Sequence, residues 1–141
     1  MLDVSEGIAL ITDGSSDYGN RSGGWAWVAL DAFEGIEKDS GAASDTTNNQ
    51  MELQAVVEGL KSLHRSHGPC NVLVYSDSQY VVYGINRGHK RNKNVGFWTA
   101  LDDAIKLHYE VEFNHVKGHE GHIWNEMADQ LAGSARKASL A

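Results

Sequence analysis

The residues with the clearest chemical potential are four carboxylates whose spacing could bring them to one site: Asp13, Glu52, Asp77 and Asp129. Carboxylates held close together repel one another, so a cluster persists only when cations neutralise it or some groups stay protonated. Oxygen ligands with retained water suit Mg²⁺ or Mn²⁺, and two such ions could clamp both oxygens of an in-line phosphoryl displacement. Taken singly, each acid has an ordinary alternative as a turn or capping residue.

Two of these acids end apolar runs that predict buried strands. The run over residues 8–13 ends at Asp13, and a similar run over residues 71–76 is followed by Asp77. Open α/β sheets build their sites at the carboxyl ends of strands, although Asp-Gly is also a common turn. Three further strands are predicted, at residues 25–30, 35–43 and 111–116.

Helical spacing of apolar residues predicts the elements that carry the other two acids. Glu52 falls in the expected first turn of a helix that follows capping candidates at residues 46–49, where the helix dipole favours a carboxylate. Asp129 lies on the margin of the apolar face of the last helix. The predicted helices lie near residues 50–63, 78–85, 97–109 and 124–135.

The order of these elements predicts a mixed sheet with helices packed on its faces. Crossover connections between parallel strands are right-handed in nearly all proteins, which places the strand before Asp77 beside the first strand. Asp13 and Asp77 should therefore be neighbours at adjacent strand ends.

Composition fits one domain over residues 1–141, with a short disordered tail from about residue 137. The single cysteine, Cys70, is expected to be a packing residue in a reducing compartment, and neither a membrane-spanning run nor a signal peptide is seen. We therefore expect a cytoplasmic location and no membrane partner.

The net charge of −7 argues only weakly against nucleic acid as a ligand. An acidic total can hide a local basic patch, or it can reflect carboxylates gathered around cations.

Four motifs, in order over nearly the whole chain, resemble type 1 ribonuclease H. They occupy residues 12–15 (TDGS), 47–53 (TNNQMEL), 76–80 (SDSQY) and 116–122 (VKGHEGH), the last followed by Asn125, Glu126 and Asp129. The resemblance implies an α/β ribonuclease H-like fold. Its five-stranded mixed sheet has three antiparallel strands first, then two strands parallel to the first, with helices on both faces.

The resemblance also implies an enzyme that hydrolyses the RNA strand of RNA–DNA hybrids endonucleolytically, leaving 3′-hydroxyl and 5′-phosphate ends. Such an enzyme would support primer removal and hybrid clearance in replication. By the match of motifs, Asp13 would bridge two Mg²⁺ ions, for which Mn²⁺ can substitute. Glu52 and Asp77 would lie on one side and Asp129 on the other.

A fifth catalytic residue, His119, matches a histidine on the family's flexible loop. Its ordinary pKa near neutrality would let it shuttle a proton or assist product release. A zinc site formed by His115, His119 and His122 is the competing interpretation, and its loose spacing without cysteine disfavours it.

Substrate contacts are implied at several polar positions. Gly14 and Ser15 would leave open backbone for the RNA strand, and Thr47 would contact a DNA phosphate beside a helix N-terminus. Matched hybrid contacts are Asn48, Asn49 and Gln79. Asn20 is a further candidate, in a loop where Asp17 and Tyr18 look like additions to the family pattern.

The basic loop at residues 87–93 is shorter than the Lys/Trp-rich protrusion of many bacterial members. Lys90, Arg91 and Lys93 are expected to form a reduced grip on the DNA strand. The alternative is a solvated connection.

We expect a monomer that binds an RNA–DNA hybrid, with no replication protein identified as a partner. Two other classes stay open: a catalytically silent hybrid-binding module, and a relative such as a resolvase, an integrase or a DEDD exonuclease that acts on other nucleic acids. A detached reverse-transcriptase domain is also conceivable.

Overall fold

The computed structural model describes residues 1–88, 91–117 and 122–140. Its elements are a 3₁₀ turn η1 (Val4–Glu6), strands β1 (Ile8–Ser16), β2 (Gly23–Leu30) and β3 (Ile36–Ala43), helix α1 (Asn48–His67), strand β4 (Asn71–Ser76), helices α2 (Gln79–Asn86) and α3 (Val95–Ile105), strand β5 (Glu110–His115) and helix α4 (Ile123–Ala138). None of these helices is both long and apolar enough to cross a membrane.

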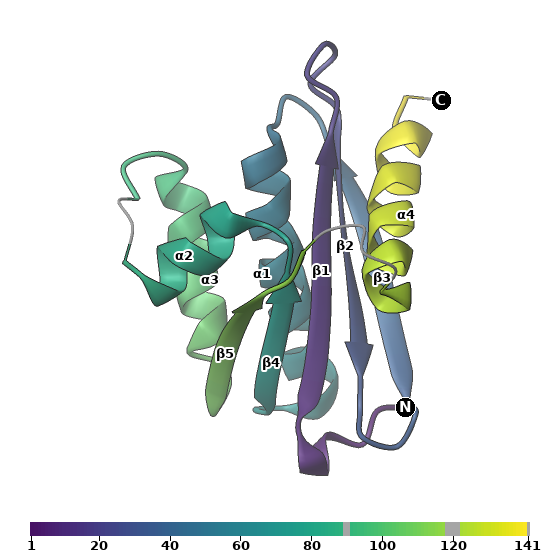
Figure 1. Ribbon diagram of the computed structural model, residues 1–141, viewed down its shortest axis with the longest axis vertical. Coiled ribbons are helices and arrows are strands. Elements are labelled where there is room, and N and C mark those ends of the chain that lie inside the picture. The colour runs from purple at the N-terminus through teal and green to yellow at the C-terminus, as the bar shows by residue number, and fades with distance from the viewer. Residues whose placement is uncertain (89–90, 118–121, 141) are drawn as a thin grey trace.

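The five strands form one sheet in the order β3-β2-β1-β4-β5 (Figure 1). β1, β2 and β3 pair antiparallel, whereas β4 lies parallel to β1 and β5 parallel to β4. This is the predicted topology, and β4 lies beside β1, as the right-handedness of most crossovers led us to expect.

β1 is buried on both faces because helices cover both sides of the sheet. Leu10 packs in the main core with Leu53 and Val56 of α1, while the next residue, Ile11, packs on the opposite face with Ala128 of α4. Successive strand residues point to opposite faces, which is why a continuous apolar run forms this strand.

Several elements extend past their predicted bounds. β1 continues to Ser16, because Gly14 pairs with Trp25 and Ser16 with Gly23 where a turn was also conceivable. α1 continues to His67 and ends at Gly68, whose φ of 72° is a conformation that glycine adopts without a Cβ penalty.

The last residues of α4 overlap the tail predicted from about residue 137, and its disorder stays a prediction. α4 runs to Ala138, and the Ser139 hydroxyl donates to the Arg136 carbonyl oxygen at 2.6 Å. Helical hydrogen bonding therefore continues past residue 137.

Candidate active site

Three carboxylates converge at the carboxyl ends of the two central strands. The pairing of β1 with β4 ends at Thr12 and Ser76, so Asp13 and Asp77 each follow a paired residue. One carboxylate oxygen from each of Asp13, Glu52 and Asp77 lies within 4.8 Å of the others. The predicted proximity of Asp13 and Asp77 is confirmed.

Glu52 reaches the cluster from the second turn of α1, not from the first turn as the sequence suggested. α1 begins at Asn48, and the Thr47 hydroxyl caps it by accepting a hydrogen bond from the Gln50 backbone N–H at 3.2 Å. Glu52 is 5% exposed, and among the described residues its Oε1 has no hydrogen-bond partner. Helix capping therefore does not account for this buried carboxylate.

Gly14 permits the close approach of α1 to β1. A Cβ at this position would lie 2.5 Å from the backbone N of Glu52 and 2.5 Å from the backbone C of Met51, distances that real Cβ atoms do not reach. The absent side chain thus lets the Glu52 backbone pack directly on the residue after Asp13. This packing role was missed by sequence reasoning, since a Gly after Asp is also typical of a turn.

Asp129 joins the cluster from α4. It lines a small hollow together with Thr12, Asp13, Asp77 and Asn125. Asn125 belongs to the fourth sequence motif but received no role there. Its spacing of four residues from Asp129, which puts both on one helix face, is the signal that could have found it.

The electrostatics of the site follow from burial and like charge. Burial raises the pKa of Asp13 most, and the charge of Asp77 and the neighbouring carboxyl of Asp129 raise it further, to about 8, against a lowering contribution from Glu52. The pKa of Glu52 is also raised well above its ordinary value, by burial first and then by Asp13 and Asp77. In metal-free protein the cluster therefore holds protons at neutral pH.

These residues fit a divalent cation. The ligand atoms are all carboxylate oxygens, and they lie close enough together to bind one ion. A bound cation would give Glu52 Oε1 a partner and would offset the repulsion among the carboxylates. Among the residues that the structure describes, this is the one His/Cys/Asp/Glu group with such geometry.

The zinc alternative gains no support from the described histidines. His115 Nε2 lies 3.2 Å from the Asp77 carbonyl oxygen, and its ring packs against Tyr83. His122 lines a separate hollow with Trp124. His119 lies outside the described residues, so its predicted role stays a prediction.

Three of the predicted hybrid contacts lie together at the start of α1. Thr47, Asn48 and Asn49 line a hollow of about 260 Å³ that the β1–β2 loop borders through Tyr18 and Arg21. Gln79 is the first residue of α2, two positions after Asp77.

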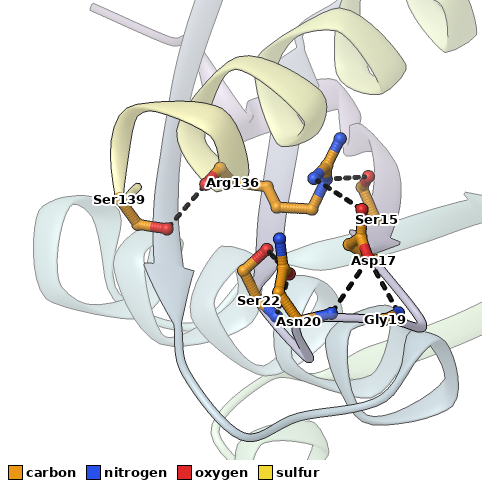
Figure 2. A network of polar contacts seen from close by, with 7 residues as sticks. All are labelled: Ser15, Asp17, Gly19, Asn20, Ser22, Arg136 and Ser139. Atoms are coloured by element: carbon orange, nitrogen blue, oxygen red, sulfur yellow. Dashed lines mark hydrogen bonds and ion pairs between the residues drawn. The ribbon is translucent and has the colours of Figure 1, made fainter. Parts of the chain in front are cut away.

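The Asn20 side chain forms hydrogen bonds within the β1–β2 loop. Its Oδ1 accepts hydrogen bonds from the backbone N–H and the hydroxyl of Ser22, at 2.9 and 2.6 Å (Figure 2). Asp17 accepts from the backbone N–H groups of Gly19 and Asn20, and these bonds lower the pKa of Asp17. Figure 2 also shows Arg136 of α4 reaching this loop, with Nε 3.3 Å from the Ser15 hydroxyl. The described contacts thus use Asn20 to shape the loop.

The three residues of the predicted basic grip differ in their surroundings. Arg91 donates to both carboxylate oxygens of Asp102 at 2.9 and 3.0 Å, donates to the Gly84 carbonyl oxygen, and lies over the Trp98 ring. Its guanidinium therefore ties α2 to α3. Lys93 is exposed, and Lys90 lies outside the described residues.

A polar chain that the sequence did not reveal joins α1 to α2 and α3. Gln50 donates to Asn94, and Asn94 donates to the Tyr80 hydroxyl, both at 3.1 Å. Trp98 donates its indole N–H to the same hydroxyl. Asn94 has a φ of 57°, which asparagine tolerates better than most residues. This chain fixes the start of α1 relative to α2, and so Glu52 relative to Asp77.

The sequence profile of the RNase H family matches residues 5–137. The chain belongs to the ribonuclease H family. A curated ribonuclease H of Hydrogenovibrio crunogenus (strain DSM 25203 / XCL-2) is 44% identical over 142 residues, covering 91% of this chain and 94% of that one. A ribonuclease H of Pseudomonas entomophila (strain L48) is 42% identical, covering 92% and 93%. The chain is therefore a hydrolase of the ribonuclease H type.

Solved structures carry the same fold. RNase H1 from the halophilic archaeon Halobacterium salinarum NRC-1 superposes with a TM-score of 0.80 at 22% identity, covering 93% of this chain and 98% of that one. LC11-RNase H1, solved in complex with an RNA/DNA hybrid, superposes with a TM-score of 0.81 at 21% identity, covering 95% and 99%.

We predict that Asp13→Asn stabilises the metal-free protein at pH 8. The raised pKa means that between about pH 4 and 8 the folded state keeps a proton that the unfolded state loses, so stability falls as pH rises through this window. The amide removes this penalty, for a gain on the order of 5 kcal/mol at pH 8 that vanishes near pH 4. Urea unfolding in EDTA measures it. The exposed Asp103→Asn is the control, and a variant less stable than wild type at pH 8 would refute the electrostatic account.

We predict that Gly14→Ala displaces α1 and withdraws Glu52 from Asp13. Overpacking against backbone costs about 1–3 kcal/mol, and hybrid cleavage should fall in parallel. Gly96→Ala is the matched control, because a Cβ there has nothing within 4 Å, and it should leave activity unchanged. Urea unfolding and a cleavage assay test both variants. Full activity of Gly14→Ala would show that the close approach is not required.

Proposed function

We propose that this chain cleaves the RNA strand of RNA–DNA hybrids endonucleolytically with two divalent ions, leaving 3′-hydroxyl and 5′-phosphate ends. The observation that carries the proposal is the convergence of Asp13, Glu52 and Asp77 within 4.8 Å, with Asp129 bordering the same hollow. Membership of the ribonuclease H family supplies the substrate class.

The four carboxylates would hold the ions. Asp13, which is next to each of the other acids, would be the shared ligand, with Glu52 and Asp77 on one side and Asp129 on the other. When bound, Mg²⁺ or Mn²⁺ would supply a water nucleophile at neutral pH and stabilise charge on the scissile phosphate and its leaving oxygen. On binding the ions, the carboxylates would release their protons to solvent, and they would hold the ions rigidly because Asp13 is fixed by β1 and Glu52 by α1.

The hollow at the start of α1 would position the hybrid. The Asn48 and Asn49 side chains offer amide donors and acceptors that can read a 2′-hydroxyl, while Thr47 lies at a helix N-terminus that favours a phosphate. LC11-RNase H1, which shares the fold, binds an RNA/DNA hybrid, and that complex supports the same substrate here. Gln79 would contact the hybrid from the start of α2, and Ser15 from β1.

Two proposals concern residues outside this hollow. His119 would take up or deliver a proton at the leaving oxygen and assist product release. Lys93, with Lys90, would contact the DNA backbone, whereas Arg91 would act by holding α2 and α3 together. The enzyme would work as a monomer in primer removal and hybrid clearance.

A hybrid whose RNA strand is end-labelled tests the proposal. We expect Mg²⁺-dependent cleavage of the RNA strand alone, with Mn²⁺ substituting, and a rate at least about a thousandfold lower for Asp13→Asn because an ion ligand is lost. Hybrid binding by Asp13→Asn, measured by fluorescence anisotropy, should persist and so separates catalysis from folding. Binding without cleavage by wild type would favour a silent module, and cleavage of plain duplex DNA would favour a nuclease of another class.

A further inference from the structure

The elements that the structure describes cover one face of the sheet only in part, at the end opposite the acid cluster. Cross-strand pairing aligns Leu30, Ala9, Leu73 and Glu112 in one row across β2, β1, β4 and β5. Paired residues share a face, and this is the face on which α4 packs against β1, β2 and β3. Figure 1 shows α4 displaced toward β2 and β3, away from β4 and β5.

The uncovered part of this face is hollowed. A groove of about 450 Å³ runs over the first residues of β1 and β4 and is floored by Ala9, Leu30 and Leu73. A second hollow of about 230 Å³ shares Ala9 and Leu30 and continues to Tyr75 and Trp124. The two hollows adjoin at Ala9 and Leu30, and the groove at the amino ends of β1 and β4 is the one farther from the acid cluster, because only the second hollow is also lined by Asn125.

A large apolar side chain of the groove floor is exposed, and two exposed aromatic residues are next to the lining in sequence. Leu73 is 41% exposed although it occupies the middle of a parallel strand. Phe33 (60% exposed) follows the lining residue Ala32, and Tyr109 (77% exposed) precedes the lining residue Glu110. An exposed apolar floor in a groove is typical of a protein-binding surface.

The charge of the residues that line the groove indicates what kind of partner it binds. Within the part of the chain that the structure describes, the groove lining contains four carboxylates and neither lysine nor arginine; the acids are Glu6, Asp31, Glu110 and Glu112. Such a rim repels nucleic acid and attracts cationic side chains, while the apolar floor requires an apolar anchor.

We propose that this groove docks a segment of a protein partner in which apolar anchor residues alternate with lysine or arginine. The anchors fill the floor over Ala9, Leu30 and Leu73, and the basic residues meet Glu110 and Glu112. Because the acid cluster lies at the opposite ends of β1 and β4, the protein can hold this partner and a nucleic acid at once. This inference goes beyond the hydrolase activity and does not depend on it.

The test uses the full chain and a fluorescein-labelled peptide of alternating leucine and lysine, followed by fluorescence anisotropy. We expect saturable binding that weakens with salt, and amide shifts in NMR spectra at Leu30, Leu73 and Glu112 but not at Asp13. The same peptide with glutamate in place of lysine should not bind. This comparison needs no protein variant, so it stands whatever happens to folding.

Two matched charge reversals sharpen the test. Glu112→Lys should weaken peptide binding about fivefold and reduce its salt dependence, whereas Asp103→Lys, on the exposed side of α3, should leave both unchanged. Hybrid cleavage should be the same in both variants. Absence of peptide binding, equal weakening by both reversals, or shifts confined to other surfaces would overturn the proposal. Wild-type dimers dispersed by Glu112→Lys would overturn it as well, since a second copy would then occupy the groove.

Discussion

The repulsion among buried carboxylates is the constraint on which the rest of the structure depends. Asp13 and Glu52 are 7% and 5% exposed, and with Asp77 they bring three oxygens within 4.8 Å. Burial and like charge raise the pKa of both buried acids, so the folded chain carries an unfavourable arrangement that local contacts relieve only in part. Such an arrangement persists only because the surrounding packing holds it. A cation bound among the carboxylates would remove the repulsion, and this gain would add to the affinity for the cation.

Close backbone contacts and side-chain hydrogen bonds hold the carboxylates together despite their repulsion. β1, buried on both faces, fixes Asp13, and Gly14 lets α1 come close enough to deliver Glu52. The chain from Gln50 through Asn94 to Tyr80 keeps α1 in place relative to α2, next to Asp77. Because these ties approach the cluster from different elements, their loss should loosen the site before it unfolds the domain.

The strand pattern and the handedness of crossovers were sufficient to predict a mixed sheet with β4 beside β1, and so the meeting of Asp13 with Asp77. Sequence reasoning placed Glu52 in the first helical turn, because several residues upstream could cap the helix and only the Thr47 bond selects one of them. It expected Arg91 to face the substrate, since a basic run does not reveal that Asp102 and Trp98 hold the guanidinium. The packing role of Gly14 also escaped it, because that role is a distance between residues far apart in the chain.

The most direct test of the account is a Mg²⁺ titration of the full chain followed by backbone amide NMR. If the cluster is the cation site, saturable shifts should appear at Gly14, Glu52 and Ser78, next to the converging carboxylates, and should be lost in Asp13→Asn. Amides of α3 should not move. Shifts that never saturate, or that spread evenly over exposed acids such as Asp103 and Glu112, would contradict the claim that these carboxylates are gathered to bind metal.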